Sequence, residues 1–261
     1  MLPFPEELYR WSARSPSWQI IAERAAWRFP SCCCGPGRPC SCSIRSPPPA
    51  IARQPSSRAT PHFKLQTSMC ETKPRSLFAQ QAGANGVDVT VILPAYYSNR
   101  SLLEVTAQQW ETSQKLNLWA PLVCLREAVR VMTATGRGGS IVTVSTIGSL
   151  VPVLRGNSVY GATRVGVTNM TKSMALEHAN AGIRVNCVPV GAMEGKFVDE
   201  EGTSERRMSG EITGPIREPG RLPMGMGDLG DVAAAVHFLA APASKYITGQ
   251  TVAVEGGFLL T

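Results

Sequence analysis

The stretch Tyr160-Gly161-Ala162-Thr163-Arg164 begins a long run of helix-forming residues. A tyrosine and a cation at positions i and i+4 of a helix lie on one face, one turn apart. A positive charge there stabilises the phenolate and lowers the tyrosine pKa below its usual value of about 10. The stretch therefore indicates a tyrosine that can exchange a proton with a substrate oxygen.

Two hydroxyl side chains precede this helix. Ser145 and Thr146 end a run that is typical of a buried strand, and Gly148 follows them, 12 residues before Tyr160. A hydroxyl at that strand end can share the substrate oxygen with the tyrosine. This combination is what a site needs to protonate a carbonyl while a hydride arrives, or to do the reverse.

Strand and helix patterns alternate from residue 76 onward. Buried strands are expected at 87–93, 140–145, 183–188 and 251–255. Helices are expected at 106–133, with Thr106 as N-cap, and at 158–180 and 228–240. The order predicts an α/β fold with a parallel sheet and helices on both faces.

Two further segments of this part have expected roles. Val167, Met170 and Met174 recur at helical spacing and are expected to pack in the core. The glycine- and charge-rich segment 191–226 is expected to form a mobile lid over the substrate.

These residues resemble the short-chain dehydrogenase/reductase family, whose pattern is Tyr-x-x-x-Lys with a serine upstream. The resemblance runs from about Ser76 to Thr261 and includes Tyr246-Ile247-Thr248-Gly249-Gln250 and Val254-Glu255-Gly256-Gly257 near its end. It implies a Rossmann-like doubly wound parallel sheet, which is expected to lack its first strands in this chain, with NAD or NADP as cofactor. It also implies hydride transfer between the nicotinamide and a small-molecule carbonyl or secondary alcohol.

The resemblance assigns catalytic positions. Tyr160 takes that of the general acid/base, and Arg164 that of the lysine. The serine position is open: aligning Thr143 with the family's asparagine selects Thr146, whereas counting back from Gly148 selects Ser145, which we favour.

Positions at the cofactor and in the preceding helix follow in the same way. Asn117 falls where the family has an asparagine that holds a proton-relay water. The resemblance places the nicotinamide half of the cofactor beside Tyr160, Arg164 and the loop of Pro189, Val190, Gly191 and Ala192.

Several departures from the family pattern concern the cofactor. Arg164 carries a planar, forked guanidinium, whereas the family's lysine at this position has a compact amine that serves both the tyrosine and the ribose. The family's Asn-Asn-Ala-Gly is replaced by Ile92-Leu93-Pro94-Ala95, and no Gly-x-x-x-Gly-x-Gly loop occurs before residue 75. Such a loop frames the pyrophosphate on a helix N-terminus. The chain is therefore either an active oxidoreductase, a catalytically inactive relative that serves at most as a subunit partner, or a truncated or frame-altered product.

Residues 1–75 differ in composition from 76–261, which is expected to be the enzyme-like domain. They hold 11 Lys+Arg against 4 Glu, which accounts for the whole net charge of +7, and 12 of the 20 prolines. Such a Pro/Arg/Cys/Ser-rich segment is expected to be irregular. It is either a disordered extension or a replacement of the original first half, and the abrupt change near Ser76 favours replacement.

Composition also limits the expected partners. The cysteines of residues 1–75 lack the paired knuckle spacing of a zinc site, so no metal is expected. The arginines are dispersed without interleaved aromatic residues, which argues against nucleic-acid binding. No run of 18 apolar residues occurs, so we expect a cytoplasmic protein that does not span a membrane. The long helices could join copies into a homo-oligomer.

Overall fold

The computed structural model describes residues 86–93, 95–194, 206 and 210–261. The expectations for residues 1–75 and for Pro94 lie outside these residues. The described part contains one parallel sheet of three strands in the order β1-β2-β3. They are β1 (Val89–Ile92), β2 (Gly139–Thr146) and β3 (Ile183–Val190). Val89 pairs with Ser140 of β2, and Gly139 pairs with Ile183 of β3.

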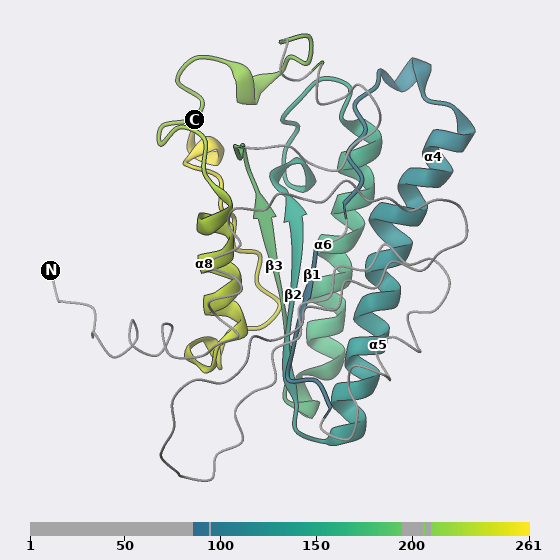
Figure 1. The fold of residues 1–261 in the computed structure, drawn as a ribbon, viewed down its shortest axis with the longest axis vertical. Coiled ribbons are helices and arrows are strands. Elements are labelled where there is room, and N and C mark those ends of the chain that lie inside the picture. The colour runs from purple at the N-terminus through teal and green to yellow at the C-terminus, as the bar shows by residue number, and fades with distance from the viewer. Residues whose placement is uncertain (1–85, 94, 195–205, 207–209) are drawn as a thin grey trace, which may run out of the picture.

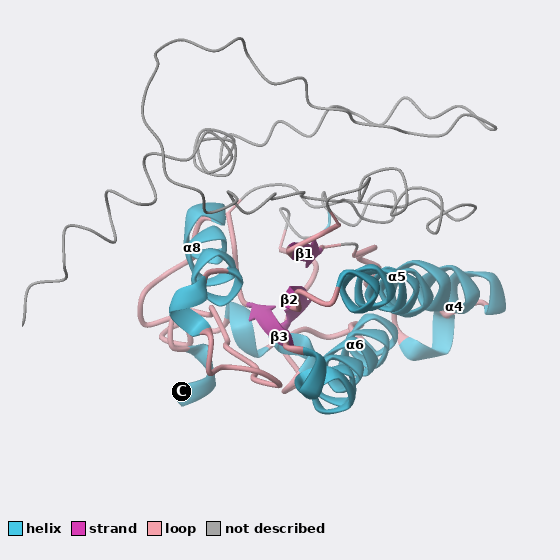
Figure 2. Ribbon diagram, turned by 90° about the horizontal axis from the view of Figure 1, so that it is seen from below, coloured by secondary structure: helices cyan, strands magenta, loops and turns pink. Residues whose placement is uncertain are grey.

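Helices cover both faces of this sheet (Figure 1, Figure 2). The helices α5 (Ala120–Thr135) and α6 (Ser158–His178) pack on one face, and α8 (Leu229–Ala240) packs on the other. The predicted fold class, a Rossmann-like doubly wound sheet without its first strands, is confirmed for the part of the chain that the structure describes.

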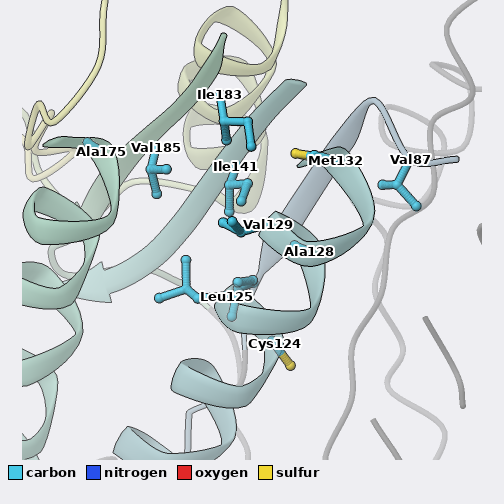
Figure 3. Packing of buried hydrophobic residues seen from close by; sticks show 11 residues of the cluster. Val87, Cys124, Leu125, Ala128, Val129, Met132, Ile141, Ala175, Ile183 and Val185 are labelled. Atoms are coloured by element: carbon cyan, nitrogen blue, oxygen red, sulfur yellow. The ribbon is translucent and has the colours of Figure 1, made fainter. Parts of the chain in front are cut away.

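The core forms two layers because strand side chains alternate between the faces. Ile141 and Val185 meet Leu125 of α5 on one face, where Figure 3 shows Leu125 and Val129 turned toward the sheet. The half-buried Met170 and Met174 of α6 pack against this cluster, as predicted. On the other face, Val142 and Val188 meet Val236 and Leu239 of α8.

The helical segment before β2 is interrupted, so the prediction of one helix at 106–133 is wrong in its middle. Thr106 caps α4 (Ala107–Gln114) through a capping box with Gln109, as expected of an N-cap. A π-helical turn, η3 (Lys115–Trp119), then separates α4 from α5. Pro121 explains the interruption, because it has no N–H for the carbonyl four residues earlier, that of Asn117. Gly136, at φ 67°, ends α5.

The predicted strand at 251–255 is not a regular strand. Isolated parallel bridges join Cys187 to Thr251 and Val190 to Val254. Pro189 lies between them on β3 and has no N–H, so the ladder that would connect the two bridges is broken there. The segment still follows β3, since Val252 donates to the Cys187 carbonyl and Val254 donates to that of Pro189, each over 2.9 Å.

Short elements complete the described part. Asp228 caps α8 with a capping box to Asp231. The remaining turns are 3-10 helices: η2 (Leu102–Glu104), η4 (Ile147–Ser149), η5 (Ala179–Ala181), η6 (Pro215–Arg217), η7 (Pro242–Ser244) and η8 (Phe258–Leu260). Among these described elements, none is a helix with the length and apolar character needed to cross a bilayer.

The described part of the expected lid, which includes 210–226, is tied to the loop between β2 and α6. The backbone N–H of Arg155 donates to the carbonyl of Thr213 over 2.7 Å, and that of Ile216 donates to Val153 over 3.2 Å. Ile216 also packs with Ile147, Val153 and Phe258 in a small apolar cluster above the strand ends. Lid mobility itself stays a prediction.

Candidate active site

The carboxyl ends of the three strands meet at one edge of the sheet, where open α/β sheets place their ligands. α6 begins beside this edge, because its first turn packs against η4, which directly follows β2. A Cβ added to Gly161 would lie 3.0 Å from the carbonyl oxygen of Gly148. This close approach brings Tyr160, the neighbour of Gly161, to the end of β2.

Tyr160 is buried, with 9% of its surface exposed. Its ring meets the ring of Tyr97 edge to face, with centroids 5.1 Å apart at an interplanar angle of 86°. Tyr97 belongs to the segment after β1. The two tyrosines therefore join the first turn of α6 to the carboxyl end of β1, a contact that the sequence did not predict.

Arg164 lies one turn further along α6, as the sequence predicted, and is only 1% exposed. Its Nη2 donates a short hydrogen bond to the carbonyl of Val144 in β2. Its Nη1 lies 3.4 Å from the carbonyl oxygen of Asn117 in η3. The guanidinium therefore connects α6 to the central strand and to the π-helical turn.

Asn117 is fully buried and uses its side chain to fix another backbone segment. Its Oδ1 accepts from the N–H of Tyr96 over 2.6 Å, and its Nδ2 donates to the carbonyl of Tyr96 over 2.8 Å. This paired contact holds the residue just before Tyr97. The side chain thus supports the tyrosine pair, while the expected relay water at Asn117 stays a prediction.

Burial controls the charge state of the tyrosine. The pKa of Tyr160 is raised above its usual value, because desolvation outweighs the opposing effect of the Arg164 cation. The pKa of Arg164 is lowered by its own burial, which Tyr160 and Cys187 partly oppose. The expectation of a lowered tyrosine pKa is therefore wrong in net direction: Arg164 acts with the expected sign, but the loss of water contributes more. Tyr160 is a neutral phenol at pH 7.

The two candidate hydroxyls differ in how their single hydrogens are used. Ser145 is 5% exposed, and its Oγ donates to the carbonyl of Arg164 over 3.3 Å. Thr146 is half-buried, and its Oγ1 accepts from the backbone N–H of Gly148 over 3.2 Å. Within the described part of the chain, the hydroxyl hydrogen of Thr146 has no acceptor.

The segment Pro189–Ala192 ends β3 and turns along the same edge. The N–H of Gly191 donates to Val254 over 2.9 Å, and the carbonyl of Ala192 accepts from Gly227 over 3.0 Å. A Cβ on Gly191 would come within 2.7 Å of the Cα of Glu255, so a larger residue could not fit there. The loop is thus packed against the C-terminal segment of its own chain.

The polar groups at this sheet edge fit the reactive, nicotinamide end of a dinucleotide cofactor. A phenol, a hydroxyl and the backbone of the β3 loop come from elements that meet at one sheet edge, with a buried cation beside them. For the adenosine end, the family's glycine-rich pyrophosphate loop would be expected in the first part of the chain, and no Gly-x-x-x-Gly-x-Gly sequence occurs before residue 75.

Sequence reasoning missed three residues beside the site. Tyr97 packs on the Tyr160 ring, and the buried hydroxyls of Ser149 and Thr168 lie 3.1 Å apart between η4 and α6. Thr168 could have been found, because it continues the i, i+4 spacing of Tyr160 and Arg164 on the same face of α6. Ser149 follows the strand end by three residues and carries no comparable signal. Tyr97 lies just beyond a predicted strand, where functional side chains gather in α/β sheets.

The chain matches the family model described as enoyl-(acyl carrier protein) reductase over residues 71–259. It is 30% identical over 174 residues to the short-chain dehydrogenase/reductase eriH of Hericium erinaceus, covering 67% of this chain and 66% of that protein. The chain spans from 52% to 72% of the length of the curated relatives compared, with 66% for eriH and 54% for the dehydrogenase/reductase SDR family member 4 of Pongo abelii.

Solved structures give the same likeness. A short-chain type dehydrogenase/reductase from Mycobacterium marinum superposes with a TM-score of 0.64 at 25% identity, covering 74% of this chain and 73% of that one. ElxO with NADP bound superposes with a TM-score of 0.63 at 25% identity, covering 73% and 75%.

Proposed function

Because the chain belongs to the short-chain dehydrogenase/reductase family, we propose that it transfers hydride between NAD(P) and a carbonyl or secondary alcohol, with carbonyl reduction as the favoured direction. The observation that carries this proposal is the buried, neutral phenol of Tyr160 at the strand ends. A neutral phenol is a proton donor, and carbonyl reduction consumes one proton at the substrate oxygen.

Tyr160 donates its hydroxyl proton to the carbonyl oxygen as that oxygen gains negative charge. The phenolate formed in this step lies one helical turn from Arg164, whose charge stabilises it in a site from which water is largely removed. A nicotinamide cofactor held beside Tyr160 would supply the hydride for the carbonyl carbon.

Thr146 is the better-supported second donor to the substrate oxygen. Its hydroxyl hydrogen is available, whereas that of Ser145 is directed at the carbonyl of Arg164. The N–H of Gly148 donates to Thr146 Oγ1 and thereby holds the threonine hydroxyl at the strand end. Because only the Thr146 hydroxyl has its hydrogen available, we assign the second donor to Thr146. The sequence had favoured Ser145 for this position.

Tyr160, Arg164 and the loop Pro189, Val190, Gly191 and Ala192 are the residues proposed to hold the nicotinamide end. A neighbour in the structural comparison carries NADP, which supports a dinucleotide in this fold. The proposal retains both NAD and NADP for this chain.

A catalytically inactive relative is the second candidate, and Arg164 favours it. The guanidinium is 1% exposed and donates to two backbone carbonyls, so it is committed to the fold rather than presented to a ribose. Such a protein would act as a subunit partner. Trp119 of η3 and Val165 and Leu176 of α6 are exposed apolar side chains that support a homo-oligomer, which light scattering after size exclusion would detect.

Turnover and binding measured on the full chain separate the two candidates. We expect purified protein to oxidise NADH or NADPH in the presence of at least one member of a panel of aldehydes and ketones, and to reduce carbonyls faster than it oxidises the matching alcohols at pH 7. Dinucleotide binding without turnover on any substrate would support the inactive relative. Equal turnover in wild type and in Tyr160→Phe would exclude Tyr160 as the proton donor.

A further inference from the structure

Three buried hydroxyls form a connected group between the end of β2 and α6. They belong to Ser145, Ser149 and Thr168, which are 5%, 9% and 5% exposed. Thr168 Oγ1 lies 3.1 Å from Ser149 Oγ, 3.4 Å from Ser145 Oγ and 3.3 Å from the carbonyl oxygen of Arg164. Ser149 Oγ donates to the carbonyl of Thr146 over 2.7 Å.

Counting hydrogens gives this group a direction. Each hydroxyl has one hydrogen to donate. Ser149 spends its hydrogen on the Thr146 carbonyl, the shortest contact of the group, so it does not donate to Thr168. The single hydrogen of Thr168 has three acceptors within reach, and Ser149 Oγ at 3.1 Å is nearer than the Arg164 carbonyl at 3.3 Å or Ser145 Oγ at 3.4 Å. The resulting chain runs from Thr168 through Ser149 to the backbone of Thr146.

The two ends of this chain are the two halves of the proposed proton-donating site. Thr168 lies on the α6 face that carries Tyr160 and Arg164, eight residues after Tyr160 and four residues after Arg164. Thr146 ends β2 and caps η4. The hydroxyl chain therefore fixes the strand end relative to the helix at the level where Thr146 and Tyr160 must reach the same substrate oxygen.

We propose that Thr168 is a positioning residue, which holds Thr146 in register with Tyr160 through Ser149. This inference rests on the proposed function. No covalent step involves Thr168, and its hydroxyl is directed into the protein. Its effect on catalysis passes through the geometry of Thr146.

Thr171 provides a matched control on the same helix. It is fully buried, and its hydroxyl lies 2.7 Å from that of Thr143 in β2. Thr171 and Thr168 thus both link α6 to β2 through a hydroxyl pair. The Thr171 pair, however, lies further from the end of β2, and its hydrogen bonds go to Val167 and Asn186 rather than to Ser149 or Thr146.

The deciding measurement is hydrogen exchange at the amides of Gly148, Leu150 and Val151 in full-length protein, which requires no turnover. These amides donate to Thr146 Oγ1 and to the carbonyl of Ile147. We expect Thr168→Val to accelerate their exchange about fivefold, the factor for the net loss of one hydrogen bond, and Thr168→Ser to restore the wild-type rate. Thr171→Val should leave this segment unchanged. Ser149→Ala removes the same link from its other end and serves if Thr168→Val does not fold.

Kinetics test the catalytic consequence. In a wild type that reduces carbonyls, we expect Thr168→Val to lower kcat about tenfold to a hundredfold with little change in KM, because a small misplacement of a reacting group has this effect. Thr168→Ser should recover activity, and Thr171→Val should keep it. Unchanged exchange in Thr168→Val and Ser149→Ala, or an equal change in Thr171→Val, overturns the positioning role. A wild type without activity refutes the proposed function, while the exchange result still decides whether Thr168 holds the strand end.

Discussion

Arg164 reaches the backbone carbonyl of Asn117 with Nη1, over 3.4 Å and across 47 residues of sequence. Pro121 has no N–H, so the α-helical donor four residues after Asn117 is absent and does not compete for that carbonyl. The same guanidinium donates to Val144 in the central strand. One buried arginine thus satisfies two backbone carbonyls that come from different elements.

Arg164→Lys should raise carbonyl-reductase activity and lower stability. A lysine restores a compact charge near Tyr160, but a single ammonium cannot easily serve both carbonyls as the planar fork does. The loss of one charge-assisted hydrogen bond should lower the free energy of unfolding by about 1.5–3 kcal/mol. Urea unfolding and steady-state kinetics measure the two effects.

Arg130→Lys is the control for Arg164→Lys, because the side chain of Arg130 is 47% exposed and bonded to Glu127. Arg130→Lys should change neither the free energy of unfolding nor the carbonyl-reductase activity appreciably. If Arg164→Lys stays folded and shows wild-type activity, Arg164 does not limit the reaction. The missing cradle for the adenosine half would then be the feature to examine.

Thr146→Ala should reduce kcat about a hundredfold, by loss of a hydroxyl that stabilises the developing oxyanion. Ser145→Ala should mainly reduce stability, by about 1 kcal/mol, because it removes a buried hydrogen bond to the carbonyl of Arg164. Both variants are compared by kcat and by thermal unfolding. A larger loss of kcat in Ser145→Ala than in Thr146→Ala would reverse the assignment.

Stability should decline in alkali because of Tyr160. Its pKa in the folded state is raised above the unfolded value of about 10 by burial. The folded state therefore favours the neutral phenol, so this contribution to stability is fully present below pH 10 or so and is lost as the pH rises through the raised pKa. Tyr160→Phe should lose less stability than wild type between about pH 9 and 11. Parallel pH dependences for the two proteins in urea unfolding would contradict the burial effect.

Dinucleotide binding should be weak, with a dissociation constant in the high micromolar range at best. Each charge-assisted hydrogen bond that a pyrophosphate fails to make costs about 1.5–3 kcal/mol, and no Gly-x-x-x-Gly-x-Gly loop occurs before residue 75 to supply such bonds. Titration calorimetry with NADH and NADPH measures the constant. A low-micromolar value would mean that another part of the chain holds the phosphates.

The sequence was sufficient for the fold class and for the placement of Tyr160 and Arg164, because strand and helix periods and the i, i+4 spacing are local properties. Pro121 and Pro189 also carry local signals, for the π-helical turn and for the broken ladder beside β3, and both were overlooked. The net pKa of Tyr160 could not be predicted, because it depends on how much water the packed structure removes. The Thr168–Ser149 contact depends likewise on how closely α6 approaches the end of β2.

The most direct test compares kcat for carbonyl reduction at pH 7 in wild type, Tyr160→Phe and Tyr97→Phe. Phenylalanine at either position keeps the edge-to-face ring contact between residues 97 and 160 and removes one hydroxyl. If Tyr160 is the proton donor, Tyr160→Phe should lower kcat at least a hundredfold, the lower end of what general acid catalysis contributes, while Tyr97→Phe stays within about threefold of wild type. Equal rates in wild type and Tyr160→Phe would contradict the account.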